Sequence, residues 1–331
     1  MVYVCTELFK QHMKAIELIA HGGIENLVLT DLPMPEFTEN EVLIRVKAIS
    51  INPADTYIRK LDALDYVFAG ERPRIMGWDI SGIVVSVGTV VTGISEGDGV
   101  FGTIKYPGHD RAGHGKGYAE FVAAPAGDLA LKPLNISHAE AVAATLAALT
   151  AWQPLSKAGI KPGDRIFITA AGGGVGHFAI QIAKYFGAYV IVLASESKKD
   201  FVLSLGADEF IDYRSQKFEE VLQPVDFVLE ALREDHIART IEVVKPGGKL
   251  ISLWSGVAGT PWETRAAERG ILAYYNAVTS SGEDMKEIAA LLEKGQIRSH
   301  IAKRFALEDI GLAHLEQESD HVQGKLVITF D

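Results

Sequence analysis

The hydrophobic and polar positions along the chain divide it into three regions. The first third carries short runs rich in apolar and β-branched residues, separated by glycines and prolines, which is typical of strands joined by tight turns. Strands at this spacing indicate a compact barrel or sandwich. The predicted strands are residues 14–18, 27–32, 41–50, 80–88, 98–101 and 119–123.

The middle region has a different pattern. Ser137 and Glu140 stand three residues apart, as in the capping box at a helix start, and an alanine-rich run follows them. Short apolar strands then alternate with helical segments, which predicts βαβ units and a doubly wound parallel sheet, as in a Rossmann domain. The predicted strands are residues 165–169, 189–194, 209–211, 226–230 and 249–253, and the predicted helices are residues 177–186 and 198–205.

The last region contains two predicted helices, at residues 283–294 and 306–317, and a final strand at residues 325–330. We expect this strand to rejoin the sheet of the first region. The sequence therefore predicts an α/β protein with two domains. One is discontinuous and consists of residues 1–136 and 280–331, with residues 1–12 as an extension. The other is continuous and consists of residues 137–279.

Composition and charge limit the classes of function. The 331 residues include 32 Lys or Arg and 43 Asp or Glu, a formal net charge of −11. This charge disfavours a nucleic-acid partner, because such binding depends on clustered basic residues. The one cysteine, Cys5, excludes an intrachain disulfide framework and a Cys₄ zinc site. With no long apolar run and no signal-peptide pattern, we expect a cytoplasmic protein without a membrane partner.

The turn after the predicted strand at residues 165–169 carries the clearest chemistry. Small residues there let a backbone approach a pyrophosphate, and the following helix N-terminus presents N–H groups and the positive end of its dipole. A strand, a glycine turn and a helix within a βαβ unit predict a dinucleotide site, and a glycine turn without a ligand is the alternative. The turn residues are Ala171, Gly172, Gly173, Gly174, Val175 and Gly176.

The end of the next strand bears on the choice between NAD and NADP. A carboxylate there would accept hydrogen bonds from the ribose of NAD, but the position holds Ser195. Lys198 follows one turn later with a positive charge, and Tyr213 is a third donor for a 2′-phosphate. Glu196 favours NAD, but it lies beyond the strand end, and we expect it to face solvent. We therefore predict NADP(H) as the cofactor.

Six segments, in order, resemble one family. Together they resemble the medium-chain dehydrogenase/reductase superfamily, and within it the zinc-independent quinone oxidoreductases and enone reductases, over residues 13–331. The segments are Met13-Lys14-Ala15-Ile16, Asn52-Pro53-Ala54-Asp55-Thr56-Tyr57, Gly77-Trp78-Asp79-Ile80-Ser81-Gly82, Gly97-Asp98-Gly99-Val100, the A-x-x-G-x-x-G run from Ala170 to Gly176, and Gln323-Gly324-Lys325-Leu326-Val327.

The resemblance implies a GroES-like catalytic domain beside a Rossmann domain, NADP(H) as the hydride donor, and often a homodimer. It assigns the 2′-phosphate to Ser195, Lys198 and Tyr213, in agreement with the strand-end argument. We add Lys325 and Thr150 to the cofactor-binding residues. Thr150 follows the alanine-rich helix and is a candidate contact of the nicotinamide ribose, with a plain helix-end hydroxyl as the alternative.

Zinc ligands of the sister branch are replaced in this chain. The zinc alcohol dehydrogenases need a cysteine near the start of the N-x-x-D segment and a histidine in a G-H-E turn, where this chain has residues such as Ile51, Asn52 and Trp78. The loop at residues 105–117 offers two histidines and a carboxylate, but their spacing is irregular, so we expect a solvated loop and no metal. These residues are His109, Asp110 and His114.

Without zinc, the substrate carbonyl must be polarised by hydrogen bonds. The resemblance gives this role to Asn52 and Tyr57, which would stabilise negative charge on oxygen while a hydride reaches a quinone ring or the β-carbon of an enone. Water or Tyr57 would supply the proton. The alternatives are a turn residue before Pro53 for Asn52 and a packed aromatic for Tyr57, and Asp55 is predicted to be structural.

Two other functions stay open. An enoyl-thioester reductase would use the same hydride chemistry, but it would require a basic patch for an acyl carrier, of which a net charge of −11 gives no sign. The second open function is a protein that binds NADPH without turnover. The presence of both candidate catalytic residues, Asn52 and Tyr57, weighs against this function. One departure from the family is Glu230-Ala231-Leu232, where the family has D-x-V-G and its glycine.

Overall fold

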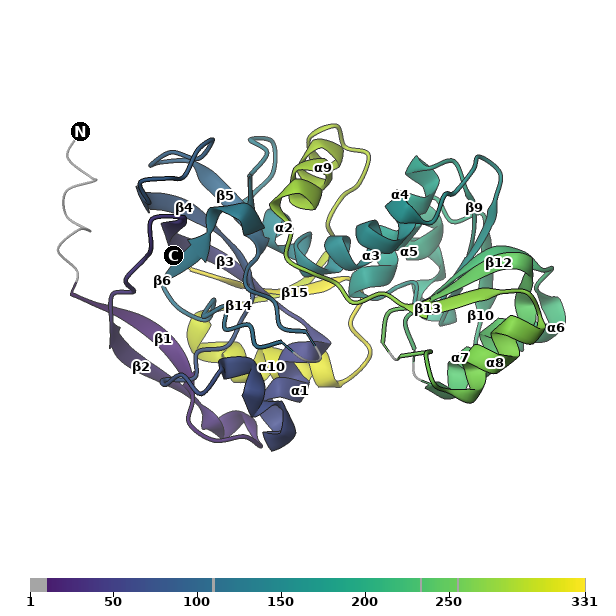
Figure 1. Cartoon of the computed structure of the whole chain (residues 1–331), viewed down its shortest axis with the longest axis horizontal. Helices are drawn as coiled ribbons and strands as arrows, with labels where there is room; N and C mark the ends of the chain where they lie inside the picture. Colours follow the sequence, from purple (N-terminus) through teal and green to yellow (C-terminus); the bar gives the residue numbers. More distant parts are fainter. Residues whose placement is uncertain (1–10, 109–110, 233, 255, 331) are drawn as a thin grey trace. The chain divides into compact units, whose positions relative to one another are not determined.

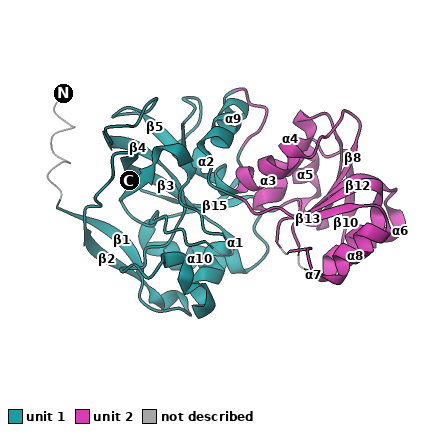
Figure 2. Cartoon of the chain, viewed as in Figure 1, with its two compact units in different colours: residues 1–146, 279–293, 299–331 teal, residues 147–278, 294–298 magenta. Residues whose placement is uncertain are grey.

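The computed structural model describes residues 11–108, 111–232, 234–254 and 256–330. The chain divides into two compact units (Figure 2). The first comprises residues 1–146, 279–293 and 299–331, and the second comprises residues 147–278 and 294–298. The chain thus passes between the units after residues 146, 278, 293 and 298, which is two more crossings than the sequence predicts.

The first unit is built on a seven-stranded sheet in the order β14-β15-β3-β4-β5-β7, with β6 also paired to β3. Strand β15 pairs antiparallel with β3, and Leu326 lies opposite Ile51, so the C-terminal strand joins the first region as expected. The strands are β3 (Glu41–Ile51), β4 (Asp79–Val87), β5 (Gly99–Thr103), β6 (Phe121–Pro125), β7 (Leu129–Leu131), β14 (Ile301–Phe305) and β15 (Lys325–Thr329).

A separate antiparallel pair, β1 (His12–Leu18) and β2 (Leu27–Pro33), begins the described part of the chain.

The core of this unit is filled by fully buried aromatic side chains, among them Phe68, Trp78 and Tyr118. Helices α1 and α10 pack on each other (Figure 1). The helices are α1 (Pro53–Lys60), α2 (His138–Ala143), α9 (Gly282–Glu293) and α10 (Ile310–Glu318), with 3₁₀ turns η1 (Ile24–Asn26), η2 (Asp62–Phe68), η3 (Ala126–Asp128) and η6 (Leu307–Asp309).

The predicted capping box at Ser137 forms, since Glu140 N donates to Ser137 Oγ at 3.2 Å and Ser137 N donates to Glu140 Oε2 at 2.8 Å. The alanine-rich run, however, forms two helices rather than one. Helix α2 ends at Ala143, and α3 (Leu146–Lys157) begins two residues after the C-cap, Ala144. Because α2 packs on β3, β4 and β15, the first unit extends to Leu146 instead of residue 136.

The second unit contains a six-stranded parallel sheet in the order β10-β9-β8-β11-β12-β13. Helices α4 and α5 lie on one side of it and α7 and α8 on the other (Figure 1), so the predicted doubly wound sheet is confirmed. The strands are β8 (Arg165–Ile168), β9 (Tyr189–Ala194), β10 (Glu209–Asp212), β11 (Val225–Glu230), β12 (Val244–Ser252) and β13 (Leu272–Tyr275).

The direction of strand succession reverses between β8 and β11, because β9 and β10 follow β8 on one side while β11, β12 and β13 continue on the other. Ligands of open parallel sheets bind beyond the carboxyl ends of the strands at such a reversal. The remaining elements are α4 (Gly174–Tyr185), α5 (Lys199–Ser204), α6 (Phe218–Val221), α7 (Glu234–Thr240), α8 (Pro261–Glu268), η4 (Glu196–Lys198) and η5 (Ile241–Val243). Among the described helices none has the length and apolar character needed to span a bilayer.

Candidate functional site

The glycine turn between β8 and α4 is closed by backbone contacts. Ala170 adopts a left-handed conformation with φ +49°, and Gly173 N donates to Ala170 O at 3.0 Å. A β-carbon at Gly176 would lie 2.5 Å from Ala170 O and 2.5 Å from the Cα of Ala171. Only glycine therefore lets the first turn of α4 pack this closely on the end of β8, which is the role of the last glycine in a dinucleotide fingerprint.

The start of α4 fits an anionic group. Its N-cap, Gly173, has no side chain with which to cap the helix, and the first N–H groups of any helix lack intrahelical acceptors. These groups and the helix dipole favour a phosphate. The backbone geometry from Ala171 to Gly176 is therefore compatible with the predicted pyrophosphate cradle, which stays a prediction.

The three residues predicted to bind a 2′-phosphate lie together at the ends of β9 and β10. Lys198 N donates to Ser195 O at 2.9 Å, and Tyr213 N donates to Ala194 O at 3.3 Å. The stem of Lys198 covers Gly172, because its Cδ lies 2.5 Å from the position of a β-carbon there. Partial burial lowers the pKa of the Lys198 ammonium.

Two charged residues, Glu196 and Arg214, lie next to the predicted 2′-phosphate residues at the ends of β9 and β10. The side chain of Glu196 is 64% exposed and contacts Lys199 Nζ at 3.3 Å, so Glu196 faces solvent as expected. Sequence reasoning missed Arg214, whose guanidinium lies 5.7 Å from the centre of the Tyr213 ring. The sequence indicates this residue only through its position, because Arg214 directly follows the predicted phosphate ligand Tyr213. Arg214 adds a second cation at the end of β10.

Glu230 occupies the point where strand succession reverses. Its carboxylate is fully buried at the end of β11 and accepts from Thr169 Oγ1 at 2.7 Å and from Leu232 N at 2.8 Å. The second oxygen lies 2.8 Å from His236 Nδ1. Ala231 N donates to Thr169 Oγ1 at 2.8 Å. Glu230, which stands where the family has the aspartate of D-x-V-G, thus ties the end of β8 to the residues after β11.

Thr150 lies inside α3 rather than after the alanine-rich helix, and it is 9% exposed. The prediction placed it after a helix because the break between α2 and α3 was not recognised. Its contact with a nicotinamide ribose stays a prediction.

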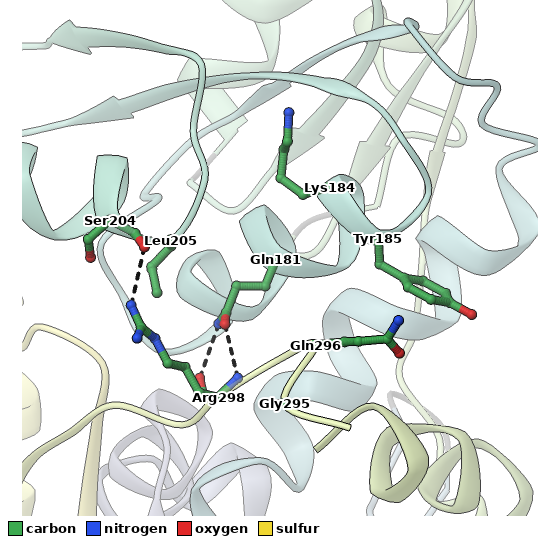
Figure 3. Close-up of a pocket in the computed structure, with 8 residues that line it drawn as sticks. All are labelled: Gln181, Lys184, Tyr185, Ser204, Leu205, Gly295, Gln296 and Arg298. Carbon is green, nitrogen blue, oxygen red and sulfur yellow. Dashed lines mark hydrogen bonds between the residues drawn. The ribbon is translucent and has the colours of Figure 1, made fainter. Parts of the chain in front are cut away.

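A groove of about 480 Å³ lies elsewhere on the second unit, beside the C-terminal half of α4 (Figure 3). Gln181 Nε2 donates to Arg298 O at 3.1 Å, and Arg298 N donates to Gln181 Oε1 at 2.9 Å. The Arg298 guanidinium donates to Ser204 O at 3.2 Å, and Lys184 Nζ lies 2.8 Å from Asp208. The hydrogen bonds of Arg298 with Gln181 and Ser204 fasten the segment at residues 294–298 to the unit. The groove lies at the end of α4 opposite the glycine turn, so it is separate from that turn.

In the first unit, the end of β3 places Asn52 at the head of α1. Asn52 is the N-cap residue, Pro53 follows at the first helical position, and Asn52 N donates to Asp55 Oδ2 at 2.7 Å. The side-chain Nδ2 of Asn52 donates to Asp79 Oδ2 at 2.8 Å. Its Oδ1 accepts from Lys325 Nζ at 2.5 Å. All of these polar side chains are at most 6% exposed.

Asp79 was part of a quoted motif, but sequence reasoning gave it no role. In the structure its carboxylate accepts from Ser50 Oγ at 2.6 Å, Thr103 Oγ1 at 2.8 Å and Leu146 N at 3.1 Å, besides Asn52. The feature of the sequence that could have indicated this role is an acidic residue at the start of a largely apolar strand. Asp79 is therefore the hub of a buried polar cluster, consisting of Ser50, Asn52, Asp55, Asp79, Thr103 and Lys325.

Burial shifts the ionisation of this cluster and its surroundings. Desolvation raises the pKa of Asp55 to about 7, and the nearby charge of Asp79 adds to the rise. Desolvation lowers the pKa of Lys325. Tyr118 is fully buried, which raises the pKa of its hydroxyl, and this hydroxyl lies 3.0 Å from Nε2 of His314. Burial lowers the pKa of His314 to about 3.

Tyr57 lies in the middle of α1 and is half-buried, one turn after Pro53 and five residues after Asn52. Lys325, predicted to bind the cofactor, instead has its ammonium inside the polar cluster, where it donates to Ile51 O at 2.9 Å and to Asn52. A direct contact between Lys325 and the cofactor stays a prediction.

The loop at residues 105–117 was expected to be solvated, but part of it is buried. His114 is 6% exposed, its Nε2 accepts from Ile75 N at 3.2 Å, and burial lowers the pKa of its ring to about 4. Trp78 Nε1 donates to Gly113 O. His109 and Asp110 lie outside the described residues. Within the part of the chain that is described, no three His, Cys, Asp or Glu side chains gather as metal ligands would.

Comparison with known proteins agrees with this architecture. Residues 38–134 match the family described as alcohol dehydrogenase GroES-like domain, and residues 205–328 match zinc-binding dehydrogenase. The GroES-like domain expected for the first unit is therefore confirmed.

Two plant enzymes and one solved structure are similar over nearly the whole chain. The 2-methylene-furan-3-one reductase of Solanum lycopersicum is 35% identical, over 96% of this chain and 79% of that protein. The chloroplastic NADPH-dependent alkenal/one oxidoreductase of Arabidopsis thaliana is 32% identical, over 96% and 80%. The structure of the quinone oxidoreductase from Coxiella burnetii has a TM-score of 0.87 and 32% identity, and it covers 97% of this chain and all of that one.

Substitution of Gly176 tests the cradle. We expect Gly176→Ala to weaken NADPH binding at least about tenfold, ~1.4 kcal/mol, because its β-carbon forces α4 away from the turn. The measurement is titration calorimetry with NADPH. Gly127→Ala is the control, since a β-carbon there meets nothing within 4 Å and the backbone is not left-handed. Unchanged affinity in Gly176→Ala would show that the turn does not hold the dinucleotide.

The raised pKa of Asp55 predicts a pH-dependent stability. An aspartate in the unfolded chain has a pKa of about 4, whereas Asp55 in the folded protein has a pKa of about 7. Between these values the folded state keeps a proton that the unfolded chain releases, so raising the pH removes stability. Asp55→Asn should therefore gain stability relative to the unsubstituted protein as the pH rises from about 4 to about 7, measured by urea unfolding.

The exposed Asp62 supplies the control for this experiment. Asp62→Asn should follow the unsubstituted protein in parallel across the same pH range. A parallel course for Asp55→Asn as well would contradict the raised pKa.

Proposed function

Because this chain belongs to the medium-chain dehydrogenase/reductase superfamily, in its quinone oxidoreductase and enone reductase branch, we propose that it transfers a hydride from NADPH to a quinone or an α,β-unsaturated carbonyl without a metal ion. The observation that carries the proposal is the Asn52 amide at the end of β3, held by Asp79 and Lys325. It stands where the zinc-dependent branch has its thiolate ligand. Trp78, where that branch has its histidine, is buried and cannot ligate a metal.

The preference for NADPH over NADH rests on the ends of β9 and β10. Ser195 presents no carboxylate to repel a 2′-phosphate, and the ammonium of Lys198 lies one turn away. Tyr213 and Arg214 add a hydroxyl and a guanidinium from the neighbouring strand end. Charge-assisted hydrogen bonds from such groups are stronger than neutral ones, so they favour the phosphorylated ribose.

When bound, the reduced nicotinamide supplies the hydride. The residues of this chain hold the acceptor and stabilise the charge that its oxygen gains. An amide nitrogen has two hydrogens, and the Asn52 Nδ2 donates one of them to Asp79. We assign the other hydrogen, together with the Tyr57 hydroxyl, to the substrate oxygen. A donor aimed at a developing oxyanion is worth about 10²–10³ in kcat. Tyr57 or water then delivers the proton.

Two expectations remain predictions for this chain, namely the homodimer that the resemblance implies and the cytoplasmic location expected from the sequence pattern. Sedimentation of the purified protein and fractionation of its source cells would test them.

The activity itself is tested by mixing the purified protein with NADPH and a panel of 1,2- and 1,4-quinones, alkenals, enones and enoyl thioesters. We expect the nicotinamide absorbance to fall with quinones or enones, and Tyr57→Phe to lower kcat about 10²-fold with unchanged NADPH affinity. Tyr66→Phe is the control, because its hydroxyl donates to Gly108 O instead. Oxidation by enoyl thioesters alone would favour the thioester reductase, and tight NADPH binding without turnover would favour a binding protein.

Substitution of Lys198 tests the cofactor preference. Lys198→Ala should raise the Kd for NADPH about tenfold or more and leave the Kd for NADH within about twofold, because only NADPH carries the 2′-phosphate. Fluorescence titration with both cofactors measures this. Lys199→Ala is the matched control, since Lys199 lies beside Glu196 on the same turn. Equal weakening for both cofactors would remove Lys198 from the phosphate site.

A further inference from the structure

The side-chain amide of Asn52 lies between two charged groups of opposite sign. Its Oδ1 accepts from the Lys325 ammonium, and its Nδ2 donates to the Asp79 carboxylate. An ammonium can only donate hydrogen bonds, and a carboxylate can only accept them. Rotating the amide by 180° would place its NH₂ against the ammonium and its oxygen against the carboxylate. The amide therefore has a single permitted orientation.

Asp79 is itself fixed. One oxygen accepts from Thr103 Oγ1 and Leu146 N, and the other accepts from Ser50 Oγ and Asn52 Nδ2. Four donors therefore occupy the hydrogen-bond acceptor capacity of this carboxylate. The group that Asn52 donates to is thus held by four segments and does not rotate.

The position of Lys325 follows from the strand pairing. Leu326 lies opposite Ile51, so the preceding residue of β15 lies beside Asn52, which follows Ile51. Gly324 makes the turn that leads into β15, with φ +77° and no room for a β-carbon, which would lie 2.4 Å from His300 O. Burying an ammonium costs several kcal/mol, yet Lys325 is 3% exposed. Its donors go to Ile51 O and Asn52 Oδ1.

We propose that Lys325 and Asp79 are positioning residues that lock the Asn52 amide in the orientation that keeps its second Nδ2 hydrogen for the oxygen of the substrate. The inference rests on the proposed reductase activity. It gives Lys325 a role through Asn52, in place of direct contact with the cofactor, and it gives Asp79 a role beyond packing.

A double-mutant cycle tests the lock. Lys325→Met keeps an unbranched apolar stem and removes the donor, and Asn52→Ala removes the amide. We expect each single variant to lower kcat about 10- to 100-fold, with NADPH affinity changed less than about threefold. Because Lys325 acts through Asn52, the double variant should be no slower than Asn52→Ala alone. Asp79→Asn should also lower kcat, and it serves as the second variant if Lys325→Met does not fold.

The matched control is Lys132→Met. Lys132 Nζ also donates to two backbone carbonyls of the same unit, those of Pro133 and Ile136. Its substitution should leave kcat unchanged. Three results would overturn the proposal. The first is a double variant whose loss of kcat is the product of the two single losses, and the second is full kcat in Lys325→Met. The third is a larger loss of NADPH affinity than of kcat in Lys325→Met.

A structural readout separates this proposal from the proposed function. Selective ¹⁵N labelling of asparagine side chains reports the Asn52 Nδ2 resonances, and their assignment comes from Asn52→Ala. We expect these resonances to shift or broaden in Lys325→Met but not in Lys132→Met. If the unsubstituted protein reduces no acceptor of the panel, the proposed function fails while this spectrum still tests the lock. Unchanged Asn52 resonances in Lys325→Met would overturn it.

Discussion

The carboxylate of Asp79 is the contact on which the rest of the first unit depends. It stands at the start of β4 and accepts hydrogen bonds from the end of β3, the head of α1, the end of β5 and the start of α3. Each of these donors is buried, and an unpaired buried donor costs about 1–3 kcal/mol. Removing the carboxylate would therefore leave four segments without the acceptor that they share. The position of Asn52, and with it the proposed chemistry, follows from this one group.

The second unit depends first on the close approach of backbone segments around the glycine turn. The left-handed Ala170 turns the chain back, and Gly176 lets α4 begin against the end of β8. The buried Glu230 then ties the end of β8 to the residues after β11. Together these contacts fix the carboxyl edge of the sheet at the point where strand succession reverses. A rigid edge of this kind is suited to a ligand that must be presented in one pose.

Local signals in the sequence predicted a large part of this arrangement. The strand, glycine turn and helix around Gly173 were predicted because all the residues concerned are neighbours in the chain, and the capping box at Ser137 was predicted for the same reason. Glu196 was expected to face solvent because it follows the end of a strand, and it does.

The parts that could not be predicted depend on distant contacts or on competing local signals. Lys325 and Asn52 are 273 residues apart, and only the register of β15 on β3 brings them together. The alanine-rich run favours one helix, but packing of its first half on β3 and β15 divides it. That break explains why Thr150 was misplaced. The burial of His114 likewise depends on contacts with Ile75 and Glu71, which lie outside its own glycine-rich loop.

The fastening of residues 294–298 to α4 has a consequence at the level of the gene. Through Gln181 and Arg298, this segment belongs to the second unit, although residues 279–293 and 299–331 on either side of it belong to the first. The second unit is therefore encoded in two separate pieces. Exchange of this unit between homologous enzymes by recombination would therefore need two inserts. If only residues 147–278 were exchanged, α4 of one enzyme would have to pack on residues 294–298 of the other.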